Sequence, residues 1–249
     1  MLKNKFLKKL LIAVFWIVLW QVAFSIANNS LLIDIPTPVM TVKAFVRLCG
    51  QSTFHIAALY TLLRVLLGFF LSVLFGVLMG YISFKIKAVK DFFSPILRLI
   101  RAVPVAAFII LVFLWVDTAF IPQLIAFLTV LPIIWESTEK ALSAVDINLT
   151  EMAKVMGMKT ADTLKYIIYP EIKPHLTASL ITGLGFAFKS GVAAEVICKS
   201  AKSLGELLWV GKTSISYDEV FAVTAMIIIL SIFLEWIIKK LLREGAKND

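Results

Sequence analysis

The segment from Asn148 to Pro170, NLTEMAKVMGMKTADTLKYIIYP, is a polar and charged insert in a chain that is otherwise strongly apolar. Asn148 and Glu151 have the spacing of a capping box, in which each side chain accepts a backbone N–H at the start of a helix. Gly157 can adopt the left-handed conformation that ends a helix. We therefore expect a short helix that begins at Asn148 and ends near Gly157, followed by a second short helix.

The first helix of this hairpin carries an apolar ridge. Its members, spaced as i, i+3, i+4 and i+7, are Leu149, Met152, Ala153 and Met156. In the second helix, Thr160 is expected to be the cap, Asp162 suits the first turn, and Pro170 prevents a simple continuation. An exposed methionine-rich ridge between membrane spans predicts a protein partner outside the membrane.

The rest of the chain is apolar enough to be a membrane protein. Its 249 residues are 60% hydrophobic, with a mean hydropathy of +0.93, above the apolar share of a soluble domain. We expect a polytopic all-α protein, whose net charge of +9 concerns topology and lipid headgroups rather than nucleic acid. The two cysteines and two histidines are widely separated and supply no metal-site spacing.

Six transmembrane helices are expected. They cover residues 10–27, 55–83, 92–116, 119–135, 174–198 and 220–238. The first could instead be a cleaved secretory signal ending at Ala27, but its apolar run exceeds the roughly 7–15 residues of such signals. The third is interrupted by Pro95 and Pro104, which free backbone carbonyls that need other partners.

Three regions follow from these spans. Residues 1–54 form the first transmembrane helix and an external loop with a short amphipathic helix. Residues 55–243 form a five-helix core that contains the hairpin at 146–170, and residues 244–249 form a cytoplasmic tail. A stripe of small residues in the second span is expected to let helices of the bundle pack closely. The stripe consists of Gly68, Ser72, Gly76 and Gly80.

The basic residues indicate the orientation. With six spans, both termini and the hairpin fall on one side of the membrane, together with most of the lysines. The outer side is left with Lys43, Arg47, Lys199, Lys202 and Lys212. Because cytoplasmic loops are enriched in Lys and Arg, we expect the hairpin and both termini in the cytoplasm.

Two motifs resemble a known family. The pattern Glu151-Met-Ala153, then Gly157, then Ile167-x-Tyr-Pro170 resembles the EAA loop of ATP-binding-cassette importer permeases, with Met152 and Tyr169 replacing Ala and Leu. The run from Ser203 to Trp209, SLGELLW, resembles a motif of the nitrate, sulfonate and taurine branch of these permeases.

The resemblance implies a type I importer permease fold in a bacterial inner membrane and a subunit that is not an enzyme. It implies a second permease copy, an external solute-binding protein and a cytoplasmic ATPase that holds ATP and Mg²⁺, so that no cofactor binds to this chain. The solute would be a sulfonate, nitrate, taurine or a vitamin precursor. The alternative is an ion-coupled carrier or channel that acts without an ATPase.

By this resemblance, the hairpin couples the bundle to the ATPase. The expected coupling residues are Glu151, Met152, Ala153, Met156, Gly157, Ile167 and Pro170. Charges at membrane depth are functional candidates by default, and the candidates for the translocation pathway are Lys189, Glu195 and Arg101. Lys189 either faces the pathway or pairs with Glu195. Arg101 and Arg98 are expected to extend to the cytoplasmic interface, and Arg64 to the outer one.

Other signals are weaker. Gly205 to Thr213 resembles a P-loop but has five residues between its glycines where four are needed, and no strand precedes it. The hairpin also fits a DNA-binding helix-turn-helix, but it lacks the basic recognition face that such a motif needs, so no nucleic-acid partner is expected. No nucleophile constellation is found, and Cys49 and Cys198 are expected to be free thiols, although a disulfide is conceivable.

Overall fold

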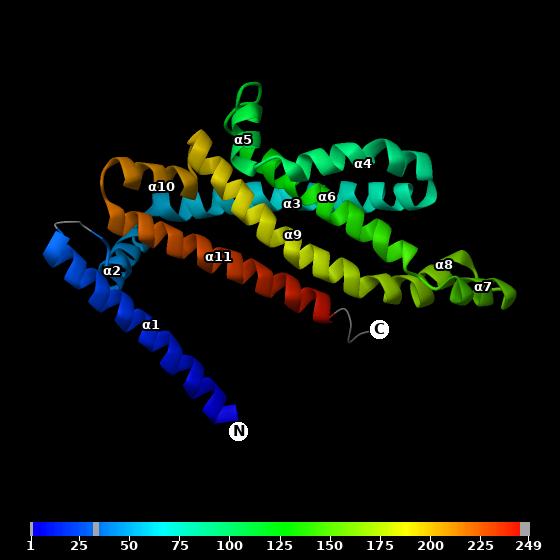
Figure 1. The fold of residues 1–249 in the computed structure, drawn as a ribbon, viewed down its shortest axis with the longest axis horizontal. Helices are drawn as coiled ribbons and strands as arrows, with labels where there is room; N and C mark the ends of the chain where they lie inside the picture. The colour runs from blue at the N-terminus through cyan, green and yellow to red at the C-terminus, as the bar shows by residue number, and fades with distance from the viewer. Residues whose placement is uncertain (1, 32–34, 245–249) are drawn as a thin grey trace.

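The computed structural model describes the backbone of residues 2–31 and 35–244, and every regular element in that part of the chain is a helix (Figure 1). The elements in order are α1 (Leu2–Leu31), α2 (Pro38–Cys49), α3 (Ser52–Lys85), α4 (Lys87–Ala102), α5 (Val105–Phe113), α6 (Ile121–Ser143), α7 (Ile147–Val155), α8 (Thr160–Thr163), a π-helical turn (Leu164–Ile168), α9 (Tyr169–Cys198), α10 (Leu204–Thr213) and α11 (Tyr217–Glu244). The expected all-α class is confirmed. Most of the expected tail, residues 245–249, lies outside the described residues.

Four helical stretches are long and apolar enough to cross a membrane. They are α3, α6, α11 and the continuous helix Thr160–Cys198. The pair α4 and α5 counts as one further span only if it is treated as broken, because the two helices meet at 102°. Within α1, Val14–Ala27 is a shorter apolar stretch. The structure is therefore that of a multi-pass membrane protein. The expected third span, however, is not one straight helix but the two helices α4 and α5.

The bend between α4 and α5 lies at Val103 and Pro104. Val103 has ψ of 128°, an extended conformation that the following proline favours, because the ring of Pro104 clashes with a helical residue before it. Pro104 then precedes the first residue of α5. In Figure 1, α4 returns beside α3, and α5 turns away from α4. Ile109 of α5 is buried against Ile121 and Ile125 of α6 and Ala194 of α9. Pro95 lies inside α4 without ending it.

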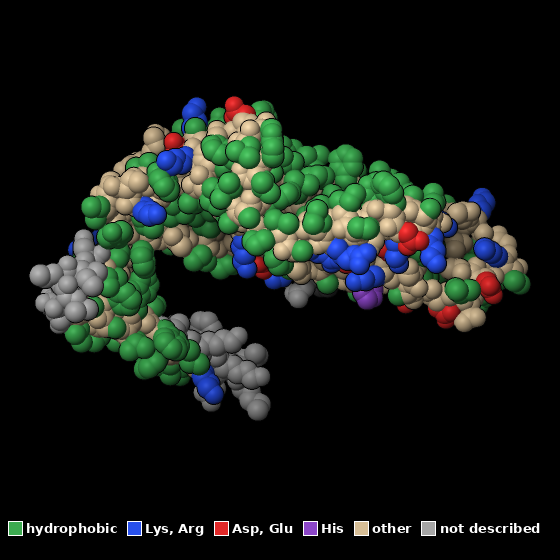
Figure 2. Space-filling model, turned by 45° about the horizontal axis from the view of Figure 1, so that its top comes forward, with side chains coloured by type: hydrophobic (Ala, Val, Ile, Leu, Met, Phe, Trp, Pro, Cys, Tyr) green, Lys and Arg blue, Asp and Glu red, His purple; other side chains and the backbone are tan. Residues whose placement is uncertain are grey.

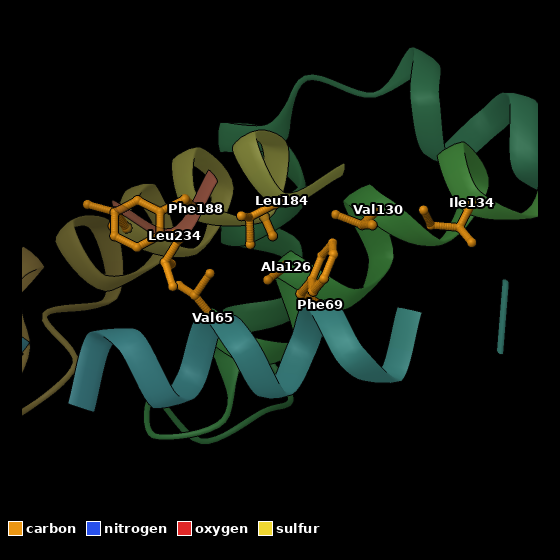
Figure 3. Close-up of a cluster of buried hydrophobic side chains, with 10 residues drawn as sticks. Val65, Phe69, Ala126, Val130, Ile134, Leu184, Phe188 and Leu234 are labelled. Carbon is orange, nitrogen blue, oxygen red and sulfur yellow. The ribbon is translucent and has the colours of Figure 1, made fainter. Parts of the chain in front are cut away.

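The core of the bundle lies between α3, α6 and α9. Figure 3 shows its buried side chains, drawn from these three helices and from α11. They include Val65, Phe69, Ala126, Val130, Ile134, Leu184, Phe188 and Leu234. The small-residue stripe of α3 permits this packing, because a Cβ at Gly68 would lie 2.3 Å from the carbonyl oxygen of Gln123 and one at Gly76 would lie 2.8 Å from Ile134 Cβ. Close packing within the bundle is thereby confirmed.

A second apolar cluster closes the end of the bundle opposite the hairpin. Here α2, α10 and the first part of α11 pack on the start of α3, through residues that include Leu48, Phe54, Leu204 and Val223. Arg47 of α2 also bonds Asp218 and Glu219 of α11 at 3.2 and 2.9 Å. Nearby, Cys49 and Cys198 are both free thiols, as expected.

Candidate functional site

The hairpin begins with α7, which is capped by a different residue from the one expected. The side chain of Asp146 accepts a 2.9 Å hydrogen bond from the backbone N–H of Asn148. The expected capping box of Asn148 and Glu151 is therefore wrong. Asp146 takes the cap because it lies one residue before the first helical residue, Ile147, where a short acidic side chain can reach the free N–H groups.

Gly157 ends α7 as expected. Its φ is +70°, the N–H of Gly157 bonds the carbonyl of Lys154, and the N–H of Met158 bonds the carbonyl of Ala153 at 3.0 Å. These two bonds form a Schellman motif, which satisfies carbonyls left free at a helix end. A Cβ at Gly157 would meet no atom within 4 Å, so glycine is needed here for its backbone conformation alone.

The apolar ridge on α7 is exposed, apart from one residue. Met152 is 50% exposed and Met156 is 70% exposed, and Val155 beside them is 89% exposed. Ala153 is fully buried instead, so it does not belong to the outward surface. An apolar surface of this kind at the tip of a polar hairpin is typical of a protein-interaction site.

The second half of the hairpin is continuous with a membrane span. Thr160 is the first helical residue and Lys159 takes the cap position without a side-chain bond, so the expected Thr160 cap is wrong. The helix also does not end at Pro170. It passes through the π-helical turn, in which the N–H of Tyr169 bonds the carbonyl of Leu164, and continues as α9. The wider turn precedes Pro170, whose ring would clash with an ordinary helical turn.

Within this half, Ile167 is half-buried and Pro170 is exposed. Both lie on the single helical path from Thr160 to Cys198. The hairpin is therefore joined by one continuous helix to the bundle core.

Glu195 of α9 is fully buried, and its partners differ from the expected one. Its Oε2 accepts a 2.8 Å hydrogen bond from the hydroxyl of Thr61 and one of 3.3 Å from the N–H of Gly205, and its Oε1 lies 3.7 Å from Arg64 Nη1. Arg64 Nη2 also donates a 3.1 Å hydrogen bond to the carbonyl of Ala201, in the loop after α9, so the extension of Arg64 to the outer interface stays a prediction. Lys189 is exposed and lies six residues earlier, about 120° away around the helix. Of its two alternatives, the pairing with Glu195 is therefore wrong, and the place on the pathway stays a prediction.

The network around Glu195 joins three helices. The hydroxyl of Thr61 in α3 also accepts the N–H of Leu204 at 2.9 Å, at the start of α10. Gly205 packs so closely on α9 that a Cβ there would lie 2.3 Å from Glu195 Cβ. The segment that resembles a P-loop is thus a short helix, capped by Ser203 and docked on the bundle. No motif pointed to Thr61, because its partners are far away in the sequence.

A polar pocket of about 450 Å³ lies on the bundle where α4, α6 and α9 meet. Its polar lining includes Arg101, Glu136, Ser137, Lys140, His175, Ser179 and Thr182. Arg101 Nη1 donates a 2.8 Å hydrogen bond to Glu136, and Lys140 Nζ lies 3.5 Å from the same carboxylate. Arg101 is therefore paired within the pocket, and its extension to the cytoplasmic interface stays a prediction. Sequence analysis missed Glu136, although its spacing from Lys140 is that of a helical ion pair.

Charged side chains gather along the part of the molecule nearest α7 and α8, whereas apolar side chains dominate the middle of the same face (Figure 2). Among the described residues, no group of His, Cys, Asp and Glu is arranged to hold a metal ion. The arrangement is thus one of an apolar bundle, a polar pocket and a projecting hairpin.

A family model described as a binding-protein-dependent transport system inner membrane component matches residues 72–244. The chain belongs to this family. As a member, it is a permease subunit of a binding-protein-dependent importer, as the two sequence motifs indicated. The match spans most of the bundle, the hairpin and α10.

Individual relatives agree with this assignment. The permease is 28% identical over 226 residues to the taurine transport system permease protein of Escherichia coli (strain K12), a match that covers 88% of this chain and 82% of that protein. It is 27% identical over 220 residues to a putative aliphatic sulfonates transport permease protein of Bacillus subtilis (strain 168), covering 87% and 78%.

The fold is also found in a solved transporter. A crystal structure of a bacterial ABC transporter involved in the import of the acidic polysaccharide alginate contains a chain that matches this one with a TM-score of 0.60 at 17% identity. The match covers 97% of this chain and 96% of that one. The expected importer-permease fold is confirmed.

Proposed function

We propose that the permease is driven by a separate cytoplasmic ATPase that binds the hairpin formed by α7 and α8. The observation that carries this proposal is the exposed ridge at Met152, Val155 and Met156 on a hairpin whose second half is continuous with α9. Closure of the ATPase around ATP would displace the hairpin, and the continuous helix would transmit that displacement to the bundle. Glu151, exposed beside the ridge, offers a charged contact to the same partner.

We further propose a homodimer of this chain, an external solute-binding protein, and a small solute such as a sulfonate, nitrate, taurine or a vitamin precursor. The names of the taurine and sulfonate relatives support this solute class. ATP and Mg²⁺ would bind to the ATPase, and this chain would hold no cofactor. An ion-coupled carrier that acts alone, the alternative, finds no support among these relatives.

The hairpin and both termini are proposed to face the cytoplasm of a bacterial cell. The lysine distribution supports this orientation. In Figure 1 the hairpin lies at one end of the long axis, and α1 and α11 are directed so that the N-terminal end of α1 and the C-terminal end of α11 point toward that end.

Co-purification with the cognate ATPase tests this proposal. Met156→Glu places a charge on the exposed ridge, and Gly157→Pro prevents the φ of +70° that ends α7. We expect both variants to reach the membrane but to lose the ATPase during purification, and Glu151→Lys to weaken its retention. The control, Lys212→Glu, reverses a charge on α10 at the other end of the molecule and should retain the ATPase. Full retention by both Met156→Glu and Gly157→Pro would reject the assigned docking site.

A further inference from the structure

The surface of α4 is divided lengthwise into a polar edge and an apolar edge. At about 100° per residue, the polar residues of α4 all fall within an arc of about 100°. Phe92, Ile96 and Leu99 lie on the other side of the helix and are 70%, 45% and 65% exposed. The polar edge consists of Lys87, Lys90, Asp91, Ser94, Arg98 and Arg101.

This divided helix extends to about the middle of the membrane. α3 has 34 residues, so its length of about 51 Å exceeds the roughly 30 Å hydrocarbon core by about 10 Å on each side when it is centred. α4 returns beside α3 from the end nearer the hairpin and stops well short of the other end (Figure 1). Its 16 residues cover about 24 Å. The bend at Val103 and Pro104 therefore lies about 14 Å inside the core.

The bend exposes backbone groups at this depth. Pro104 caps α5 without a side-chain hydrogen bond, so the N–H groups of Val105, Ala106 and Ala107 have no partner within their helix. All three residues are exposed. A long side chain can extend to the membrane surface, but a backbone N–H cannot. Because irregular backbone at membrane depth must be covered by protein or line a water-filled cavity, the bend does not face lipid.

The polar edge indicates that the neighbour of the bend is water. Arg98 is exposed, and its side chain makes one hydrogen bond within the described part of the chain, from Nε to the carbonyl of Ser94 at 3.3 Å. A guanidinium without an ion-pair partner is costly against lipid and in a dry protein interface. Arg101, near the bend, lines the polar pocket with residues of α6 and α9. The polar edge and the pocket therefore adjoin.

We propose that the polar edge of α4 and the adjoining pocket form one wall of a water-filled vestibule that opens on the side of the hairpin and ends at the bend between α4 and α5. This inference rests on the proposed import function in one respect, which is that the vestibule is the inner half of the solute route. The apolar edge of α4 faces lipid, so the boundary between water and lipid runs along this helix.

The test compares two neighbouring residues of α4 that lie at nearly the same depth on different edges. Arg98→Cys and Leu99→Cys are made separately in a chain without its native thiols (Cys49→Ser, Cys198→Ala), and the transporter with its ATPase is studied in membrane vesicles of both orientations. The measured quantity is the rate of reaction with trimethylammonioethyl methanethiosulfonate, a water-soluble reagent that does not cross membranes. In vesicles whose outward side carries the hairpin, we expect Arg98→Cys to react at least about 10-fold faster than Leu99→Cys, because the reactive thiolate forms in water and not in lipid.

A second pair nearer the hairpin, Asp91→Cys and Phe92→Cys, repeats the comparison and should show the same difference. Three results would overturn the inference. Equal, fast reaction on both edges would mean that α4 does not lie at membrane depth. Slow reaction on both edges, with and without ATP, would mean that the second copy covers the polar edge. Fast reaction of Arg98→Cys only from the side opposite the hairpin would place the opening wrongly. Retention of the ATPase by the hairpin does not depend on these rates, so failure of this inference is distinguishable from failure of the proposed function.

Discussion

At the scale of single residues, Glu195 is the most constrained charge in the described part of the molecule. It is fully buried, accepts hydrogen bonds from α3 and α10, and lies opposite Arg64, whose side chain is 14% exposed. Removing one partner from a buried pair leaves an uncompensated charge, which is more damaging than losing an exposed pair. Glu195 thus holds the C-terminal end of α9 to its neighbours and does not line the pocket, although the sequence made it a pathway candidate.

We expect Glu195→Ala to destabilise the protein by about 3–5 kcal/mol, the range for breaking a buried ion pair. The measurement is the thermal unfolding midpoint of the detergent-purified protein. The control is Glu219→Ala, which removes an exposed carboxylate that pairs with Arg47, and it should cost about 0–1 kcal/mol. Equal losses for the two variants would contradict the structural role of Glu195.

Single residues also explain what sequence analysis could and could not find. The left-handed conformation of Gly157 was predictable, because glycine after a short amphipathic helix has few other uses. The partner of Glu195 was not predictable, because Thr61 and Arg64 are more than a hundred residues away and no local pattern connects them. Lys189 does not line the pocket, so its place on the translocation pathway stays a prediction.

At the scale of elements, the contact between α3 and α6 depends on small residues. At Gly68 an added Cβ would press on backbone, 2.3 Å from the carbonyl oxygen of Gln123, so the helices would have to move apart. At Gly185 of α9 an added Cβ would lie 3.8 Å from Glu235 Oε1, an ordinary contact. The two glycines therefore form a matched pair, since both lie in long helices but only one lies at a tight crossing.

Gly68→Ala is expected to destabilise the protein by about 1–3 kcal/mol, as overpacking does elsewhere. Gly185→Ala should be neutral or slightly stabilising, because alanine is the better helix former by about 1 kcal/mol. Thermal unfolding of the two variants in the same detergent provides the comparison. If Gly68→Ala unfolds at the temperature of the wild type, α3 and α6 do not cross as closely as described.

The helices show which structural features can be predicted from patterns in the sequence. Apolar length predicted α3, α6, α9 and α11, because each must satisfy its backbone within lipid. The course of the chain at two prolines was less predictable. Pro104 bends α4 from α5 by 102°, whereas at Pro170 a π-helical turn lets the helix continue into α9. Both prolines remove one N–H, and the surrounding packing decides which outcome follows.

At the scale of the whole molecule, the permease consists of a helical bundle and a projecting hairpin. The hairpin is formed by α7 and α8 and lies beyond the end of the packed core (Figure 1). Its exposed ridge has no partner among the residues that the structure describes, and its second helix is continuous with α9, which packs on α3 and α6. The same helix lines the polar pocket with His175, Ser179 and Thr182.

A distance measurement between the two hairpins of the assembled transporter tests this account most directly. Spin labels are placed at Val155→Cys, an 89% exposed residue beside the ridge, with Cys49→Ser and Cys198→Ala removing the native thiols. The distance between the labels in the two permease copies is then compared with and without ATP. We predict that ATP shifts this distance and that Gly157→Pro abolishes the shift. A distance that ATP leaves unchanged, while the bound ATPase continues to hydrolyse it, would contradict a hairpin that transmits the movement of the ATPase.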